Sequence, residues 1–234
     1  MQRITRLKQR ASMAEVPHLF VLAGTNGAGK SSVGGAFLRE SGGQYFNPDE
    51  ITREILSANP SLGLAKANEQ AWQLGVRILE KAIVEGRSHA FETTLGGNTV
   101  PALIVRAVTA GHQLHLWYAG LDSVDRHLAR IAARVAHGGH DIPAEKVRER
   151  YQSSMRNLIA LLPLATKISV YDNSAEQDPE SAAPNPMLVL GVGEGIVHFP
   201  AQLNQLHCTP NWAKALVVRA FEVFTSALLA RADV

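Results

Sequence analysis

The chain has 234 residues, of which 46% are hydrophobic and 19% are charged, so it can bury the core of one globular domain. Its formal net charge of +2 is too small to indicate a nucleic-acid partner by itself. The single cysteine, Cys208, excludes an internal disulfide and a cysteine-rich zinc site, and it favours a reducing, cytoplasmic setting.

The first 17 residues are basic, because three arginines and a lysine precede the first acid, Glu15. No apolar stretch of signal-peptide length follows them, and no run in the chain is long enough to cross a bilayer. Since chain termini often fray, residues 1–17 are expected to form a disordered tail. An arm that touches a membrane or RNA is the alternative.

Strands and helices are predicted to alternate along residues 18–173. Short apolar runs indicate strands, and apolar residues at helical spacing indicate the helices between them. The expected strands are 18–23, 44–46, 89–92, 113–121 and 167–171, and the expected helices are 30–40, 50–56, 64–85, 101–110, 124–136 and 144–162. This order predicts an α/β fold in three layers, with a parallel sheet and helices on both faces.

The character of the chain changes after Tyr171. Residues 172–186 are polar and contain three prolines, which predicts a loop. Residues 187–192 and 195–199 are expected to form a hairpin, and 211–232 an amphipathic helix. We expect the whole segment 174–234 to pack on the core.

A glycine-rich loop follows the first strand and leads into the first helix. Glycines let the backbone turn sharply and point several N–H groups at a phosphate, and the helix directs its positive end to the same place. Lys30 would reach the β- and γ-phosphates, and the Ser31 hydroxyl would ligate magnesium. The predicted site for ATP (or GTP) comprises Gly24, Thr25, Asn26, Gly27, Ala28, Gly29, Lys30, Ser31 and Ser32.

Two other strands end in polar residues, at the edge of a parallel sheet where ligands bind. Asp49 follows the second strand, where it could accept a proton from a substrate hydroxyl or help to hold magnesium. Glu92, Thr93 and Thr94 end the third strand and suit hydrogen bonds to a hydroxyl-rich substrate, or the positioning of a hydrolytic water. The structural alternatives are a helix cap at Asp49 and an ordinary strand end at Glu92.

Arginines recur on the helix at 124–136 and after the glycine-rich loop that follows it. Like charges four residues apart weaken a helix by a few tenths of a kcal/mol per pair, and an anionic partner would offset this. Residues 126–156 are therefore interpreted as a basic lid over the phosphates, with a solvated basic face as the alternative. Its cationic members are Arg126, Arg130, Arg134, Lys146, Arg148 and Arg150. His137 and His140 lack a third ligand, so no metal other than magnesium is expected.

Four segments together resemble the zeta-toxin-like P-loop kinases, and in particular their smaller chromosomal members, often labelled predicted ATPases. The similarity covers about residues 18–173. It is carried by Gly-Thr-Asn-Gly-Ala-Gly-Lys-Ser-Ser (24–32), Asn-Pro-Asp (47–49), Phe-Glu-Thr-Thr-Leu (91–95) and Arg-Val-Ala-His-Gly-Gly-His-Asp-Ile-Pro (134–143).

The resemblance implies strand order 2-3-1-4-5 and specific roles for the polar residues. Lys30 and Ser31 would bind ATP and magnesium, and Asp49 would be the catalytic base and a further magnesium contact. Arg134 and either Arg148 or Arg150 would clamp the γ-phosphate. The substrate would be held by Glu92, Thr93, Thr94, Arg130, His140 and Arg150.

In the best-known zeta toxins the substrate is UDP-N-acetylglucosamine, phosphorylated on a sugar hydroxyl, and an antitoxin blocks the nucleotide site. The leading interpretation of this chain is therefore a kinase for a small molecule with a hydroxyl, such as a nucleotide sugar, with an antitoxin-like protein as a candidate partner. A P-loop ATPase or nucleotide switch, with Glu92 orienting water, is the alternative. A nucleic-acid-binding module ranks lowest, because no aromatic residues interleave with the arginines.

Overall fold

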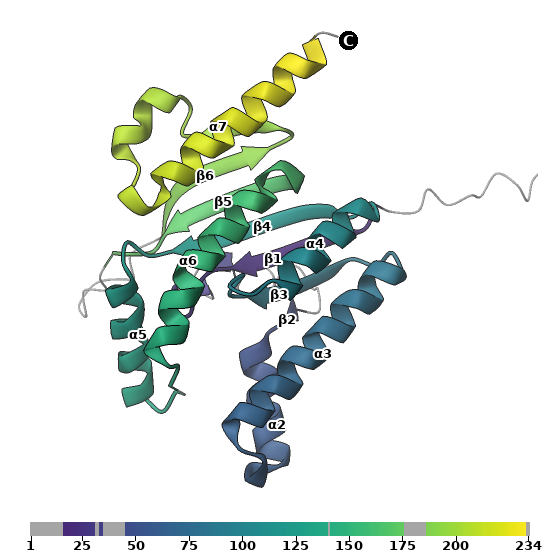
Figure 1. Cartoon of the computed structure of the whole chain (residues 1–234), viewed down its shortest axis with the longest axis vertical. Coiled ribbons are helices and arrows are strands. Elements are labelled where there is room, and N and C mark those ends of the chain that lie inside the picture. The colour runs from purple at the N-terminus through teal and green to yellow at the C-terminus, as the bar shows by residue number, and fades with distance from the viewer. Residues whose placement is uncertain (1–15, 31–32, 35–44, 140, 176–185, 233–234) are drawn as a thin grey trace, which may run out of the picture.

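The computed structural model describes residues 16–30, 33–34, 45–139, 141–175 and 186–232, with side chains to residue 225. The expected basic tail and most of the expected helix at 30–40 therefore lie outside the described residues. Figure 1 shows a central sheet with helices packed along it. Among the described helices, none has the length and apolar character that crossing a membrane requires.

Seven strands form one sheet in the order β2-β3-β1-β4-β5-β6-β7. The first five strands pair in parallel, which confirms the order 2-3-1-4-5, whereas β6 and β7 continue the sheet as an antiparallel hairpin. The sequence predicted this hairpin but not its place at the edge of the same sheet. The strands are β1 His18–Ala23, β2 Tyr45–Phe46, β3 His89–Thr93, β4 Gln113–Gly120, β5 Ala165–Asp172, β6 Met187–Gly193 and β7 Ile196–Phe199.

The long helices lie within a few residues of their predicted bounds. They are α2 Pro48–Ala58, α3 Leu64–Val84, α4 Thr99–Thr109, α5 Val124–Ala136, α6 Ala144–Leu161 and α7 Asn211–Ala232. Three short 3-10 helices at Pro60–Leu62, Leu162–Leu164 and Leu203–Cys208 were not predicted. Each lies at a connection between longer elements, where hydrophobic periodicity carries little signal.

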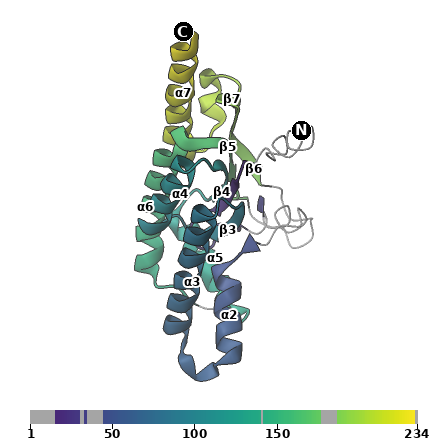
Figure 2. The same cartoon turned by 90° about the vertical axis from the view of Figure 1, so that its right-hand side faces the viewer.

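The two faces of the sheet are covered differently. Helices α3, α4, α6 and α7 lie together on one face (Figure 2) and bury Leu19, Val21 and Ala23 of β1 in the main core. The alternate residues Phe20 and Leu22 point to the opposite face, as the two-residue period of a strand requires. There Gly34 approaches the Leu22 and Trp117 side chains, so chain from the start of the first helical segment lies over that face.

Helices α2 and α3 form a hairpin that projects beyond the sheet (Figure 1). Asn47 begins it, because its side-chain oxygen accepts hydrogen bonds from the backbone N–H groups of Asp49 and Glu50. The N-cap of α2 is therefore Asn47 rather than Asp49.

Candidate active site

The glycine-rich loop closes tightly over the ends of the central strands. Gly24, Gly27 and Gly29 have positive φ angles of 145°, 80° and 77°, which L side chains rarely adopt. A Cβ atom on Gly24 would overlap the Ala119 carbonyl oxygen of β4, so the loop and the strand can approach this closely only through glycine. The Gly24 N–H group in turn donates to the Thr93 carbonyl over 3.2 Å.

The inner backbone of this loop is suited to an anion. Within the described residues, no protein acceptor faces the N–H groups of Asn26, Gly27 and Gly29. Two carbonyl groups of the loop are held by neighbouring side chains, since the His127 ring donates to the Asn26 carbonyl over 2.7 Å and Asn173 Nδ2 donates to the Ala28 carbonyl over 2.9 Å. A loop fixed through its carbonyl groups, with three N–H groups that no described acceptor engages, suits the phosphate groups of a nucleotide.

Lys30 and Glu92 form an ion pair at the centre of the site. Lys30 Nζ lies 3.3 Å from Glu92 Oε1 and 3.0 Å from the Gly24 carbonyl oxygen, and the two side chains are only 10% and 11% exposed. The other carboxylate oxygen accepts from Tyr45 OH over 2.6 Å and from Asn47 Nδ2 over 3.4 Å. Glu92 is therefore fixed by three neighbours, none of which the sequence analysis had paired with it.

Asp49 faces the basic lid. Its Oδ2 atom lies 3.9 Å from Arg134 Nη1, and the side chains are 45% and 38% exposed. An ion pair this long, between side chains this exposed, contributes little to the stability of the fold. What matters is that it places the two side chains beside each other. It links the first turn of α2 to α5, the helix predicted to carry the phosphate-clamping arginine.

A cavity of about 510 Å³ opens beside Lys30, between the phosphate loop, the α2–α3 hairpin, the end of β3 and α6. Predicted site residues on its wall are Asn26, Lys30, Asp49, Glu92, Thr93, Thr94 and Arg150. We call this space the acceptor cavity. It brings residues from four separate segments to one place, as the argument from strand ends anticipated.

The opposite wall of the acceptor cavity is apolar and was not predicted. Trp72 and Val76 of α3 line it with Phe46, and Ile142 and Pro143 close it from the lid loop. The Trp72 side chain remains 49% exposed. Its position one residue away from the buried α3 stripe, which includes Ala67 and Ala71, could have marked it as a residue that the core does not need.

The end of β3 is shaped by α6. Leu95 adopts a positive φ of 55°, and Asn157 Nδ2 donates to the Leu95 and Gly97 carbonyls over 2.7 and 3.0 Å. The Thr93 hydroxyl accepts from the Leu95 N–H over 3.0 Å. This strained turn is therefore bonded to a helix, and it orients the two threonines that were predicted to contact substrate.

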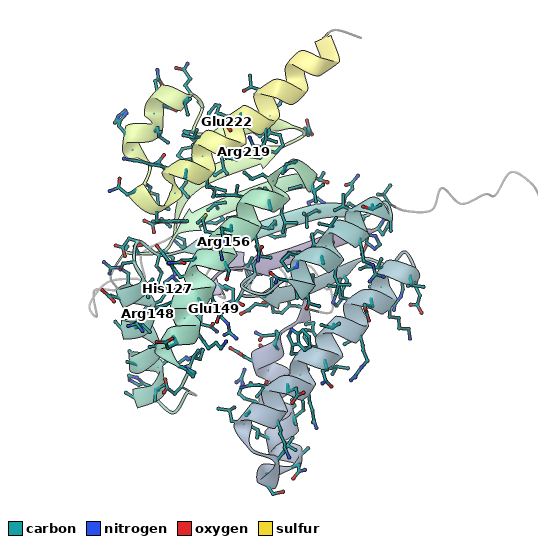
Figure 3. The ribbon with its side chains drawn as sticks, viewed as in Figure 1. His127, Arg148, Glu149, Arg156, Arg219 and Glu222 are labelled. Atoms are coloured by element: carbon teal, nitrogen blue, oxygen red, sulfur yellow. The ribbon has the colours of Figure 1, made fainter. Side chains whose placement is uncertain are left out.

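The predicted arginines lie in different places. Arg150 lines the acceptor cavity and donates to the Asn26 side-chain oxygen over 2.8 Å. Arg148 is exposed on α6 and does not line the cavity (Figure 3). Arg130 donates to the Asn173 carbonyl over 2.7 Å, lies beside Gly29 of the phosphate loop, and does not line the cavity.

Three predicted residues, Ser31, Ser32 and His140, lie outside the described residues. Among the residues that are described, no three His, Cys, Asp or Glu side chains gather into a metal site. A magnesium ion here would thus depend on nucleotide phosphates and Ser31, with Asp49 as the carboxylate predicted to contact it. This is the donor set expected for magnesium bound with a nucleotide.

Solved structures with a similar fold include two that superpose on most of this chain. The AvrRxo1-ORF1:-ORF2 complex with ATP superposes with a TM-score of 0.60 at 17% identity, over 83% of this chain and 64% of that one. The chain thus spans slightly less than two thirds of that relative. The PezAT chromosomal toxin–antitoxin system of Streptococcus pneumoniae gives a TM-score of 0.50 at 16% identity, over 77% and 80% of the two chains.

Sequence comparison extends these findings. An uncharacterized protein of Haemophilus influenzae is 34% identical over 128 residues, which are 55% of this chain and 88% of that protein. The model of the zeta toxin family matches residues 2–178, which contain the phosphate loop, the acceptor-cavity residues and the basic lid. With its P-loop kinase fold and this match over most of its length, the chain belongs to the zeta toxin family.

Proposed function

We propose that this protein is a kinase that uses ATP and magnesium to phosphorylate a hydroxyl group of a polar small molecule, with nucleotide sugars among the candidates. The observation that carries the proposal is the acceptor cavity beside Lys30. A phosphate loop alone serves ATPases and kinases equally. A cavity of about 510 Å³ next to it, with carboxylates, hydroxyls and an apolar wall, is the kind of space that a second substrate needs.

The site residues fall into two groups, one that binds the phosphates and one that acts on the acceptor. Lys30 and the loop N–H groups bind the phosphates, and magnesium, when bound with the nucleotide, neutralises the charge that develops on them. Asp49 accepts the proton of the attacking hydroxyl as its oxygen bonds to the γ-phosphorus and the bond to ADP breaks. Glu92 is held by Tyr45, Asn47 and Lys30, so it suits a fixed anchor for other hydroxyls of the acceptor.

Two arginines suit the charge of the transferring group. Arg150 already bonds to the phosphate loop through Asn26, and Arg134 lies close to Asp49. Arginine presents several N–H donors in a fixed plane, which matches the equatorial oxygens of a phosphoryl group in transfer. We assign the clamp to this pair because Arg150 lines the cavity and Arg134 lies 3.9 Å from Asp49, whereas Arg148 is exposed and in neither position.

To test this proposal, the protein is incubated with γ-³²P-ATP and a bacterial metabolite extract, and the products that carry the label are identified. Label on an organic product is expected, whereas label only in inorganic phosphate would favour the ATPase alternative, in which Glu92 orients water. Asp49→Asn should lower transfer by about 10²- to 10⁴-fold while leaving ATP affinity unchanged. The matched control is Glu54→Gln, an exposed acid on the same helix that does not line the cavity. Undiminished transfer by Asp49→Asn would remove Asp49 as the base.

An antitoxin-like protein partner belongs to the same proposal. It is supported by the PezAT toxin–antitoxin system and the AvrRxo1-ORF1:-ORF2 complex, both of which share the fold. A cytoplasmic setting is also proposed, since the single cysteine suits a reducing environment. Expression of the chain with and without its genomic neighbour, scored by growth, would test for toxicity and for its neutralisation.

A further inference from the structure

A second cavity, of about 270 Å³, lies between the end of β4, the helices α5 and α6, and the start of α7. Its wall includes Tyr118, His127, Tyr151, Arg156 and Trp212, and it shares no lining residue with the acceptor cavity. We call it the rear cavity, because His127 separates it from the phosphate loop. The kinase proposal gives it no role.

His127 presents an unused acceptor to the rear cavity. The side chain is only 1% exposed, and Nδ1 lies 2.7 Å from the Asn26 carbonyl oxygen. A carbonyl can only accept, so Nδ1 carries the proton. Burial lowers the pKa of the ring to about 4, which keeps the ring neutral at pH 7 and leaves Nε2 as a bare acceptor. Within the described residues Nε2 has no partner, and it is not fully buried, so it keeps some exposed surface on the wall of the rear cavity.

The other walls of the rear cavity present ring faces. Tyr118 and Trp212 lie with their centroids 6.4 Å apart, and Tyr151 meets the His127 ring edge-on at 5.5 Å. The polar ends of two of these rings are already engaged, Tyr118 OH with the Ser154 hydroxyl and Trp212 Nε1 with Asp172. The cavity that these rings line therefore suits a flat apolar group.

Arg156 supplies positive charge to the rear cavity. It is exposed on α6 (Figure 3), and no ion pair of its guanidinium group is found among the described residues. An arginine that combines exposure with a place on a cavity wall is suited to bind a carboxylate or phosphate at the entrance. A ring, one hydrogen-bond donor and one anionic group are thus the features that this wall would recognise.

We propose that the rear cavity is an effector site for a small planar aromatic acid that carries an N–H or O–H donor, and that His127 transmits its binding to the phosphate loop. The ring lies among the tyrosines and Trp212, its donor bonds to His127 Nε2, and its anionic group pairs with Arg156. Because the same imidazole holds the Asn26 carbonyl, a ligand on Nε2 polarises and repositions that bond. Asn26 also accepts from Arg150, so the effect reaches the acceptor cavity.

Binding is tested with two probes on the full-length chain, by calorimetry or ligand-observed NMR. Anthranilate has the ring, the carboxylate and an N–H donor, whereas benzoate lacks only the donor. Anthranilate should bind about three- to ten-fold more tightly than benzoate, as one added hydrogen bond predicts. Arg156→Ala should weaken both by about ten-fold or more, and Arg77→Ala, an exposed arginine on α3 away from this cavity, should not.

Coupling is tested by titrating ATP with and without saturating anthranilate. The dissociation constant for ATP should change by about five-fold or more, and Arg156→Ala should abolish the change at the same anthranilate concentration. ATP binding itself needs no acceptor, so this experiment does not depend on the proposed kinase reaction. Failure of anthranilate to bind, binding that Arg156→Ala leaves intact, or binding without any change in ATP affinity would each overturn the proposal.

Discussion

Replacement of Gly24 by alanine tests the closeness of the phosphate loop to β4. Gly24 has a φ of 145°, and its new Cβ atom would overlap the Ala119 carbonyl oxygen and lie 3.3 Å from the carbonyl carbon. The unfavourable backbone angle alone costs about 1–2 kcal/mol. The overlap is with backbone, which cannot rotate away as a side chain can, and such overpacking adds about 1–3 kcal/mol. We expect Gly24→Ala to lower the free energy of unfolding by about 2–5 kcal/mol.

Gly111→Ala is the matched control, because it isolates the backbone angle. Gly111 has a φ of 97°, but nothing lies within 4 Å of its Cβ position, so about 1–2 kcal/mol should be lost. Urea denaturation measures both variants, and calorimetry measures their ATP affinity, which only Gly24→Ala should reduce. Equal losses of stability in the two variants, or normal ATP binding by Gly24→Ala, would refute this account of the loop.

Three further predictions address the basic lid, the apolar wall of the acceptor cavity, and the histidines His127 and His89. Arg150→Ala should reduce phosphoryl transfer by at least about ten-fold, whereas Arg148→Ala should be near wild type, and initial rates decide between them. Trp72→Ala should raise the KM for the acceptor by about ten-fold without changing ATP affinity, which steady-state kinetics would show. Burial lowers the pKa of His127 and of His89 from 6.5 to about 4, so the unfolded chain binds more protons between these values. Stability should therefore fall as pH falls through this window, by up to about 1.4 kcal/mol per pH unit for each histidine, and urea denaturation of the wild type and His89→Gln would measure the slope.

The part of the fold that the sequence predicts well is the part with strong local periodicity. Apolar stripes such as those of 64–85 and 124–136 specify helices because each helix buries one face. The strand order came from the family resemblance, since alternation alone allows several orders for parallel strands. That β6 and β7 join the same sheet depends on pairing between β5 and β6 across a loop, and no local pattern records such a pairing.

The candidate site also has one part that local sequence predicts and another part that depends on how distant segments pair. The phosphate loop was predictable because its backbone geometry requires glycine at fixed positions, and such a requirement is visible in single residues. Asn47 and Tyr45, which orient Glu92, were missed because their roles depend on the register that places β2 beside β3. Which of Arg148 and Arg150 lines the cavity likewise depends on the rotation of α6, which no local pattern records.

The apolar wall of the acceptor cavity shows why shared motifs do not determine the substrate. In the proposed reaction Lys30 serves the phosphates and Asp49 serves the reacting hydroxyl, and these demands are the same for any acceptor. The remaining wall comes from α3 and the lid loop, where Trp72 and Ile142 meet only through tertiary packing. Exposed positions on α3 can change without disturbing the core stripe of Ala67 and Ala71. Differences in acceptor among proteins with this phosphate loop should therefore be found on the cavity-facing side of α3, and exchanging Trp72 between relatives should transfer acceptor preference while ATP use stays the same.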